Sequence, residues 1–143
     1  MACELCDENG GDVLWRDERC RVVQVDEPGY PGYCRVIWNA HVKEMTDLSH
    51  DERAHCLEIV LAVEATIREL MNPDKINLAS LGNMTPHLHW HVILRLREDP
   101  HFPNAIWSAP LRPAQAAGAR IPLAKLRAAL AEKLAAAGKP SIS

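Results

Sequence analysis

Stretches of β-branched and aromatic residues along the chain predict two β-hairpins that flank a long helix. Residues 21–25 (RVVQV) and 33–38 (YCRVIW) have this character, and the loop between them holds two prolines and two glycines. Residues 76–81 and 87–95 are expected to form two further strands, joined by residues 82–86. Two hairpins around one helix make an α+β arrangement.

The helix between the hairpins is expected over residues 49–71. Ser49 and Glu52 have the spacing of a capping box, which satisfies two amide donors at the start of a helix. Asn72-Pro73 ends it, because proline disfavours the helical conformation of the residue before it. Apolar residues recur along it at steps of four and three and predict one buried stripe: Cys56, Val60, Val63, Ile67 and Leu70.

The last third of the chain predicts an arm and a second helix. Residues 98–113 are rich in proline and polar side chains, which indicates an extended arm, and residues 122–137 have a leucine stripe with Gly138 as a cap. We therefore expect an α+β fold, an antiparallel meander sheet of about five strands with one long helix and a C-terminal helix. Residues 1–113 would form the main domain including the arm, and 114–143 an alanine-rich helical extension.

Composition and charge narrow the class of protein. The chain has 143 residues, of which 48% are hydrophobic and 24% charged, as is usual for one globular domain. Sixteen basic against nineteen acidic residues give a net charge of −3, which argues against general nucleic-acid binding. No apolar run approaches the ~20 residues that span a bilayer. The acidic start (MACELCDENGGD) lacks the features of a secretory signal, so a cytoplasmic protein is expected.

The five cysteines divide into two groups. Cys20, Cys34 and Cys56 lie within apolar patterns and are expected to be core residues, and the odd count argues against a disulfide framework. Cys3 and Cys6 form a Cys-x-x-Cys pair at the start of the chain. A redox pair would open a helix after a strand, and no strand is predicted there, so half of a zinc site is the better functional interpretation. Two incidental thiols are the alternative.

Three of the seven histidines lie close together in the segment PHLHWHVIL. His87, His89 and His91 alternate with apolar residues, so a strand would place all three imidazoles on one face. Adjacent rings would repel one another if all were protonated. The three imidazoles must therefore differ in state, as neutral, charged or ligand-bound rings. By contrast, His50 and His55 fall on the charged start of the predicted helix, and we expect both to be solvated.

The segment 87–93 resembles the motif of the histidine triad (HIT) superfamily, His-φ-His-φ-His-φ-φ with φ apolar. Gly82-Asn83 is similar to the loop of small residues and an amide that precedes the triad in that family. Residues 37–41 (IWNAH) stand where the family has Val-Pro-Lys-x-His. Trp38-Asn39 in place of Pro-Lys, and Leu94 where proline is common, are departures at positions that carry no chemistry. The resemblance covers roughly residues 3–95 and points to a bacterial HIT-like nucleotide hydrolase.

This resemblance implies hydrolysis at an α-phosphate, with a dinucleoside polyphosphate such as diadenosine tetraphosphate, or a related nucleotide, as substrate. By position in the motif, His89 is the nucleophile that forms a covalent nucleotidyl-histidine, and a backbone carbonyl is the expected acceptor for its other ring nitrogen. His91 would donate to the α-phosphate or to the leaving group. No Walker loop or acidic Mg²⁺ cluster is seen, in agreement with positive charge supplied by imidazoles.

Three further residues match substrate-binding positions of the family. Asn83 would bond a phosphate or bridging oxygen, Asp26 the ribose hydroxyls, and Asn77 stands near a second amide position. Each also has a structural interpretation, because Asp26 can cap the loop that it begins and Asn77 can bridge strands. Likewise, Trp107 either covers a nucleotide base or packs against its own domain.

Other functions remain open for the same residues. A nucleoside phosphoramidate hydrolase or a nucleotidyl transferase would use His89 in the same way. A regulatory module would bind a nucleotide without catalysis. A metal-dependent enzyme with a His-x-His pair is the least favoured, because no carboxylate partner is found near the triad.

A zinc site and a homodimer are also expected. Some relatives, including the galactose-1-phosphate uridylyltransferase branch, bind zinc with a Cys-x-x-Cys pair, a histidine after the second strand and the first motif histidine. That resemblance implies a closed, structural zinc site of Cys3, Cys6, His41 and His87. A homodimer is expected from the family and from Ile59 and Leu61, which lie off the main helical stripe.

Overall fold

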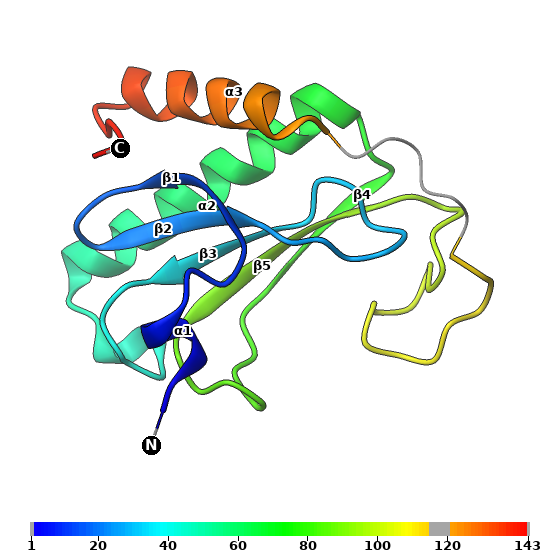
Figure 1. Cartoon of the computed structure of the whole chain (residues 1–143), viewed down its shortest axis with the longest axis horizontal. Helices are drawn as coiled ribbons and strands as arrows, with labels where there is room; N and C mark the ends of the chain where they lie inside the picture. The colour runs from blue at the N-terminus through cyan, green and yellow to red at the C-terminus, as the bar shows by residue number, and fades with distance from the viewer. Residues whose placement is uncertain (1, 115–120, 143) are drawn as a thin grey trace.

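The computed structural model describes residues 2–114 and 121–142, and its centre is a five-stranded antiparallel sheet in the order β1-β2-β3-β5-β4 (Figure 1). Its strands are β1 (Asp12–Arg16), β2 (Cys20–Gln24), β3 (Cys34–Trp38), β4 (Lys75–Ala79) and β5 (His89–Arg95). Its helices are α1 (Glu4–Asp7), the short 3-10 helix η1 (Met45–Asp47), α2 (His50–Met71) and α3 (Leu123–Ala136). The expected α+β fold is thereby confirmed.

The order of the strands places the histidine strand inside the sheet. β1, β2 and β3 follow one another as a meander, and α2 then carries the chain across to β4 at the far edge. The hairpin partner β5 returns between β4 and β3, so β5 has a neighbour on each side. Both predicted hairpins are confirmed, whereas the sequence did not locate β1 or α1.

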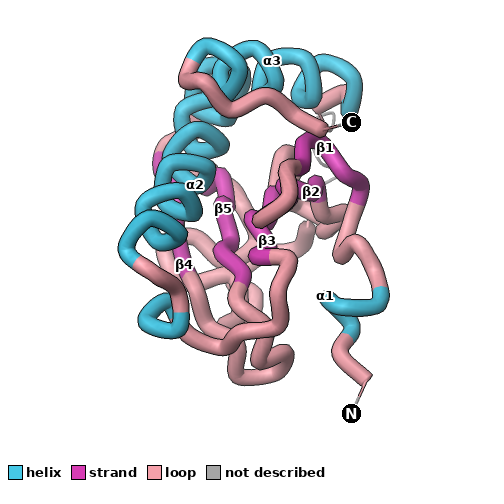
Figure 2. The backbone as a smooth tube through the Cα atoms, turned by 90° about the vertical axis from the view of Figure 1, so that its left-hand side faces the viewer, coloured by secondary structure: helices cyan, strands magenta, loops and turns pink. Residues whose placement is uncertain are grey.

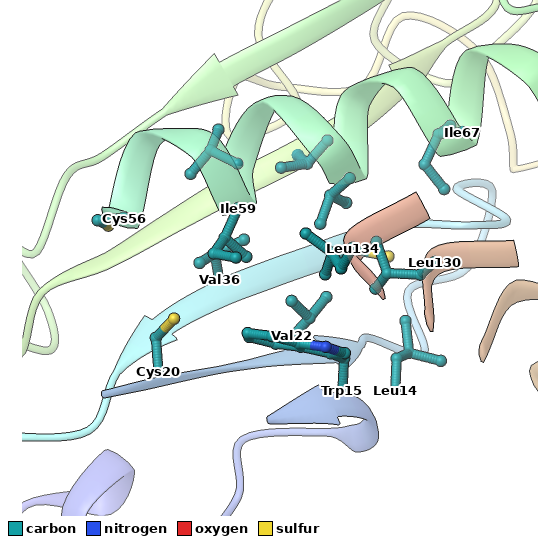
Figure 3. Close-up of a cluster of buried hydrophobic side chains, with 14 of the residues drawn as sticks. Leu14, Trp15, Cys20, Val22, Val36, Cys56, Ile59, Ile67, Leu130 and Leu134 are labelled. Carbon is teal, nitrogen blue, oxygen red and sulfur yellow. The ribbon is translucent and has the colours of Figure 1, made fainter. Parts of the chain in front are cut away.

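Helices α2 and α3 cover one face of the sheet. α2 packs against β3 and β5, and α3 packs against β1 and α2. Figure 3 shows Val36 of β3 below Ile59 of α2, with Leu130 and Leu134 of α3 beside them. Cys20, Cys34 and Cys56 are buried in this core, as predicted. Figure 2 shows α2 and α1 on opposite sides of the strands, so the face of the sheet away from α2 is left to the N-terminal segment and the loops.

The ends of α2 form as the sequence predicts. The Ser49 side chain accepts from the Glu52 amide at 3.2 Å, and the Glu52 carboxylate accepts from the Ser49 amide at 2.8 Å. At the other end, Asn72 is left-handed with φ 45°, the conformation that ends many helices. Pro73 follows directly, so the helix has a defined stop.

Two expectations for α2 are wrong. Ile59 is fully buried in the core, so the apolar residues on the outer side of the helix are Leu57 and Leu61, which are 40% and 55% exposed. His55 is buried rather than solvated, because its Nε2 lies 2.6 Å from an Asp17 carboxylate oxygen. The charged residues around His55 in the sequence face solvent, but the ring itself turns towards the β1–β2 turn.

The C-terminal part agrees with its sequence pattern. Within 98–113 the structure has turns and no helix or strand, and the arm leaves the sheet beyond the end of β5 (Figure 1). α3 buries Leu126, Leu130 and Leu134, and Gly138 follows it with φ 79°. The division at residue 113 stays a prediction, with residues 115–120 of the connection outside the described part. No helix of the described residues is long and apolar enough to cross a bilayer.

Candidate active site

The register of β3 against β5 creates a polar face in the middle of the sheet. His91 lies opposite Arg35 and His89 opposite Ile37, so these four side chains share the face away from α2. His87 precedes β5 rather than belonging to it, which corrects the expected strand 87–95. As a result, the three imidazoles do not form one row: His89 and His91 line a cavity, and His87 turns towards the N-terminal cysteines.

His89 is held in a single tautomer. Its Nδ1 donates to the backbone carbonyl of His87 at 2.6 Å, as predicted for the candidate nucleophile. Ser80 supports the same segment, because its hydroxyl donates to the His89 carbonyl at 3.0 Å. Burial lowers the pKa of His89; the bond to the His87 carbonyl raises it by less, and the charge of Arg35 lowers it further. A neutral ring with its proton on Nδ1 has a free lone pair on Nε2, which is the form that a nucleophile needs.

His91 is also a neutral ring, but its partner differs. The Tyr33 hydroxyl lies 2.6 Å from Nδ1 of His91. Burial, together with the charges of His89 and Arg35, lowers the pKa of His91 to about 4. Burial raises the pKa of Tyr33, so its hydroxyl keeps the proton that it can donate to His91. With that donor on Nδ1, the proton of His91 lies on Nε2, where the N–H can donate a hydrogen bond to a substrate oxygen.

A cavity of about 430 Å³ lies over these two histidines. Asn83 and Gly82 of the β4–β5 loop line one part of it, and Trp107 of the arm lines another. The Trp107 ring lies edge-on to His91 with centroids 5.0 Å apart and is half exposed, so it borders the cavity instead of filling a core. Gly82 has φ 85°, a left-handed conformation that favours glycine in this loop. The volume is typical of small-molecule sites.

The other two predicted substrate residues lie elsewhere. The Asn77 side-chain oxygen accepts from Arg95 at 2.7 Å, and Asn77 pairs with Ile93, two residues beyond His91 on β5. Arg95 also binds Asp99, where burial alone would raise the carboxyl pKa but the bonds from Arg95 and nearby amides hold it at about 2. Asp26 follows the end of β2 and is not among the residues that line the cavity. Substrate contacts by Asn77 and Asp26 stay predictions.

The sequence pattern missed two residues of this site, Tyr33 and Arg35. Both alternate along the chain with Cys34 and Val36, which face the core, so the alternation on its own would have placed them on the opposite face. An arginine inside a strand otherwise rich in apolar residues was the available signal. Their position next to His91 depends on the β3–β5 pairing, which local sequence does not specify.

The four predicted metal ligands come together at one end of β5. Nδ1 of His87 lies 3.3 Å from the Cys3 sulfur and 3.5 Å from the Cys6 sulfur, and Nδ1 of His41 lies 3.4 Å from the Cys6 sulfur. The two Nδ1 atoms are 3.3 Å apart. Tetrahedral zinc with bonds of about 2.3 Å to sulfur and about 2.05 Å to nitrogen would separate its ligands by about 3.3 Å (N to N) and about 3.6 Å (S to N). The donor set and its spacing therefore fit zinc.

Neighbouring bonds orient this cluster. Nε2 of His87 donates to the Trp38 carbonyl at 2.6 Å, which leaves Nδ1 as the ligand atom. Arg21 of β2 holds α1 against the sheet by donating to the carbonyls of Leu5 at 2.7 Å, Glu8 at 3.1 Å and Asn9 at 3.0 Å. Leu5 packs on Val23 and Ile37. These backbone and core contacts thus hold Cys3 and Cys6 next to the two histidines.

Known proteins resemble this chain in both sequence and structure. The family model of the HIT domain matches residues 7–98. A histidine triad protein from Marinobacter aquaeolei VT8 is 25% identical with a TM-score of 0.72, covering 95% of this chain and 96% of the other. A histidine triad protein from Bradyrhizobium japonicum is 24% identical with a TM-score of 0.70, covering 93% and 96%. A Hit-like protein from Bartonella henselae, described as involved in cell-cycle regulation, is 19% identical with a TM-score of 0.64, covering 88% and 92%. No curated protein sequence matches.

Proposed function

Because the chain belongs to the HIT domain family, we propose that it is a nucleotide hydrolase acting at an α-phosphate, with a dinucleoside polyphosphate such as diadenosine tetraphosphate as substrate. The observation that carries this proposal is the bond from Nδ1 of His89 to the His87 carbonyl, 2.6 Å long. It gives a neutral imidazole whose free Nε2 belongs to a ring that lines the cavity. Such a ring is a competent nucleophile towards phosphorus.

Two displacements complete the proposed reaction. Nε2 of His89 forms a bond to the α-phosphorus while the bond from phosphorus to the bridging oxygen breaks, and the His87 carbonyl stabilises the resulting positive ring. The leaving oxygen accepts a hydrogen bond from Nε2 of His91 and departs as a polyphosphate anion, because a neutral imidazole does not give up its only ring proton. Water then attacks the phosphorus, the bond from phosphorus to Nε2 of His89 breaks, the nucleoside monophosphate is released and the proton of the water passes to solvent. Asn83 in the cavity wall is suited to bind a phosphate oxygen during both steps.

Trapping of the covalent intermediate tests this chemistry. The protein is mixed with diadenosine tetraphosphate, quenched within milliseconds to seconds and measured by intact mass. An adduct of one adenylyl group is expected on the wild type and on His91→Ala, and none on His89→Ala. His50→Ala is a matched control, because His50 is an exposed histidine outside the cavity. An adduct that survives His89→Ala contradicts the assignment of the nucleophile.

The same assay separates the remaining functions. A phosphoramidate hydrolase would turn over adenosine 5′-phosphoramidate through the same adduct but not the dinucleotide. A transferase would pass the adenylyl group to an added acceptor. A regulatory module would bind AMP without turning over either compound.

We also propose that Cys3, Cys6, His41 and His87 hold one structural zinc ion. The support is the fit of the four donor atoms, which all lie within 4.8 Å of one another. All four protein ligands are in place, so the site would be closed and would supply no metal-bound water to the reaction. The metal would fix α1 beside the cavity, whose lining includes Glu4 and Leu5.

A homodimer is the third part of this proposal, and the cytoplasmic location stays a prediction. β4 is an edge strand of the sheet, with backbone groups on one side available for pairing. Leu57 and Leu61 on the outer side of α2 and Leu78 of β4 are exposed apolar residues. A second copy of the chain that covers them would remove this apolar surface from water.

A further inference from the structure

Arg35 is a cation in the cavity that the reaction above does not use. It lies on β3 directly opposite His91, and its side chain lines the cavity with both histidines. Its Nε atom is buried and has no hydrogen-bond partner. None of the ion pairs formed between side chains of residues 2–114 and 121–142 includes Arg35. Its contact with the Tyr33 ring, 5.9 Å from the centroid, is a weak one for a guanidinium.

A buried N–H donor without a partner is costly for folding alone, and more so when it belongs to a charged group such as the Arg35 guanidinium. The planar group offers paired N–H donors that match two oxygens of a phosphate. His89 and His91 are neutral, so Arg35 supplies the fixed positive charge among the described residues that line the cavity, whereas Glu4 is an exposed acid in the same lining. The cavity is therefore built to receive an anion next to His91.

The position of Arg35 indicates which phosphate it meets. Ile37, not Arg35, lies opposite the nucleophile His89, and Arg35 lies two residues away on the same strand, opposite His91. In an in-line displacement the leaving group departs on the side away from the nucleophile. The guanidinium thus lies next to the ring that donates a hydrogen bond to the leaving oxygen, on the leaving-group side of the α-phosphate.

We propose that Arg35 binds the phosphates of the leaving group, so that the site selects nucleotides whose α-phosphate is joined to a further phosphate. This inference rests on the proposed function and deepens it by naming the residue that recognises the leaving phosphates. A leaving polyphosphate gains negative charge as the bond to the α-phosphorus breaks, and a fixed cation stabilises that charge. An amine leaving group is neutral once protonated, so Arg35 gives it no comparable help.

Paired substrates test the inference. Diadenosine tetraphosphate and adenosine 5′-phosphoramidate transfer the same adenylyl group and differ in the leaving group. For Arg35→Gln we expect kcat/KM for the dinucleotide to fall about 100-fold, and kcat/KM for the phosphoramidate to change by less than about threefold. Arg35→Lys should restore part of the loss, because it returns the charge without the paired donors. Arg97→Gln, which removes an exposed arginine outside the cavity, should leave the ratio of the two substrates unchanged.

Binding of products separates failure of this inference from failure of the proposed function. By calorimetry, the wild type should bind ADP at least about tenfold more tightly than AMP, and Arg35→Gln should remove that preference. If neither substrate is turned over but the preference depends on Arg35, the hydrolase proposal fails and the phosphate site stands. An equal loss on both substrates, an unchanged dinucleotide rate, or an ADP preference that survives Arg35→Gln would overturn the inference.

Discussion

The Nδ1 atom of His89 lies 2.6 Å from the backbone oxygen of His87, so the candidate nucleophile is bonded to the main chain of a candidate zinc ligand. The ring of His87 is itself fixed by its bond to the Trp38 carbonyl. The proposed zinc site and the proposed catalytic site are therefore adjacent, although their side chains point to different neighbours. A change in the position of His87 would therefore alter the orientation of the His89 ring through this one hydrogen bond.

Loss of the cysteine pair tests the zinc site. The wild type, purified without a histidine tag, should contain about one zinc per chain by elemental analysis. Cys3→Ser with Cys6→Ser should release the metal and lower Tm by at least about 5 °C, because a ligand that stabilises only the folded state is lost. We expect kcat to fall less than about fivefold, since the site is closed. Asp7→Ser, in the same short helix, should keep the zinc. Freshly purified, reduced protein without metal would contradict this prediction.

Removal of the Tyr33 hydroxyl tests the orientation of His91. Tyr33→Phe should lower kcat for diadenosine tetraphosphate about tenfold, because the ring loses the donor that fixes its proton on Nε2. The free energy of unfolding should fall by about 1–2 kcal/mol, since Nδ1 of His91 is left unpaired. Tyr30→Phe is the matched control: its hydroxyl bonds Asp99 and His101 outside the cavity, so stability should fall while kcat is kept. Equal kcat in both variants would refute the role of Tyr33.

The low pKa of His91 predicts a dependence of stability on pH. The folded protein holds this pKa at about 4, whereas an unfolded chain has a histidine pKa near 6.5. Between these pH values the unfolded state binds a proton that the folded state does not, so the free energy of unfolding decreases as pH falls from about 6.5 to about 4.

Urea denaturation across that range measures the effect. His91→Gln should show a smaller decrease, because glutamine does not titrate, while His89, Arg35 and Tyr33 remain around the position. The same slope in both proteins would show that His91 is not the group responsible.

The pair formed by buried His55 and partly buried Asp17 is expected to contribute strongly to stability. Burial alone would raise the pKa of Asp17, but bonds from the Cys20 and Arg19 amides and from His55 lower it. Asp17→Ala removes all three acceptor contacts and should decrease the free energy of unfolding by about 3 kcal/mol. Asp51→Ala, an exposed acid in the first turn of α2, should cost less than about 1 kcal/mol. Similar losses in chemical denaturation would contradict the importance of the pair.

Association of the protein is tested by its mass in solution. Sedimentation at micromolar concentration should give twice the chain mass of 15.9 kDa. Leu61→Asp places a charge on the exposed apolar side of α2 and should shift the protein towards the monomer without lowering its helix content. Glu69→Gln, a charge change on the side of the same helix that contacts Lys133 of α3, is the control. A wild type that sediments near 16 kDa would rule out the dimer.

The parts of the fold that sequence could predict are those set by neighbours along the chain. The capping box of Ser49 and Glu52, the end of α2 before Pro73 and the two hairpins all depend on residues within a few positions. His55 could not be placed in this way, because its burial depends on Asp17, 38 positions earlier.

The same distinction, between features set by neighbouring residues and features set by distant ones, applies to the candidate site. His89, His91 and Asn83 were identified from one motif and its loop, and all three line the cavity. Tyr33 and Arg35 reach the same cavity only through the pairing of β3 with β5, and that pairing is set by the path of α2 across the sheet. The register in which β3 pairs with β5 decides where these two side chains lie, and the local sequence pattern does not specify that register.

The three carbonyl bonds made by Arg21 bear on how the protein would take up its metal. They bind α1 and the two residues after it to β2 without any contribution from the cysteines or histidines. In many small zinc domains, ordering of the chain and metal binding are a single event. Here the segment that carries Cys3 and Cys6 is already ordered by a guanidinium and by Leu5, so the ion would meet a preorganised set of ligands. Metal exchange would then be a local reaction at one edge of the molecule, during which the sheet and both long helices stay folded.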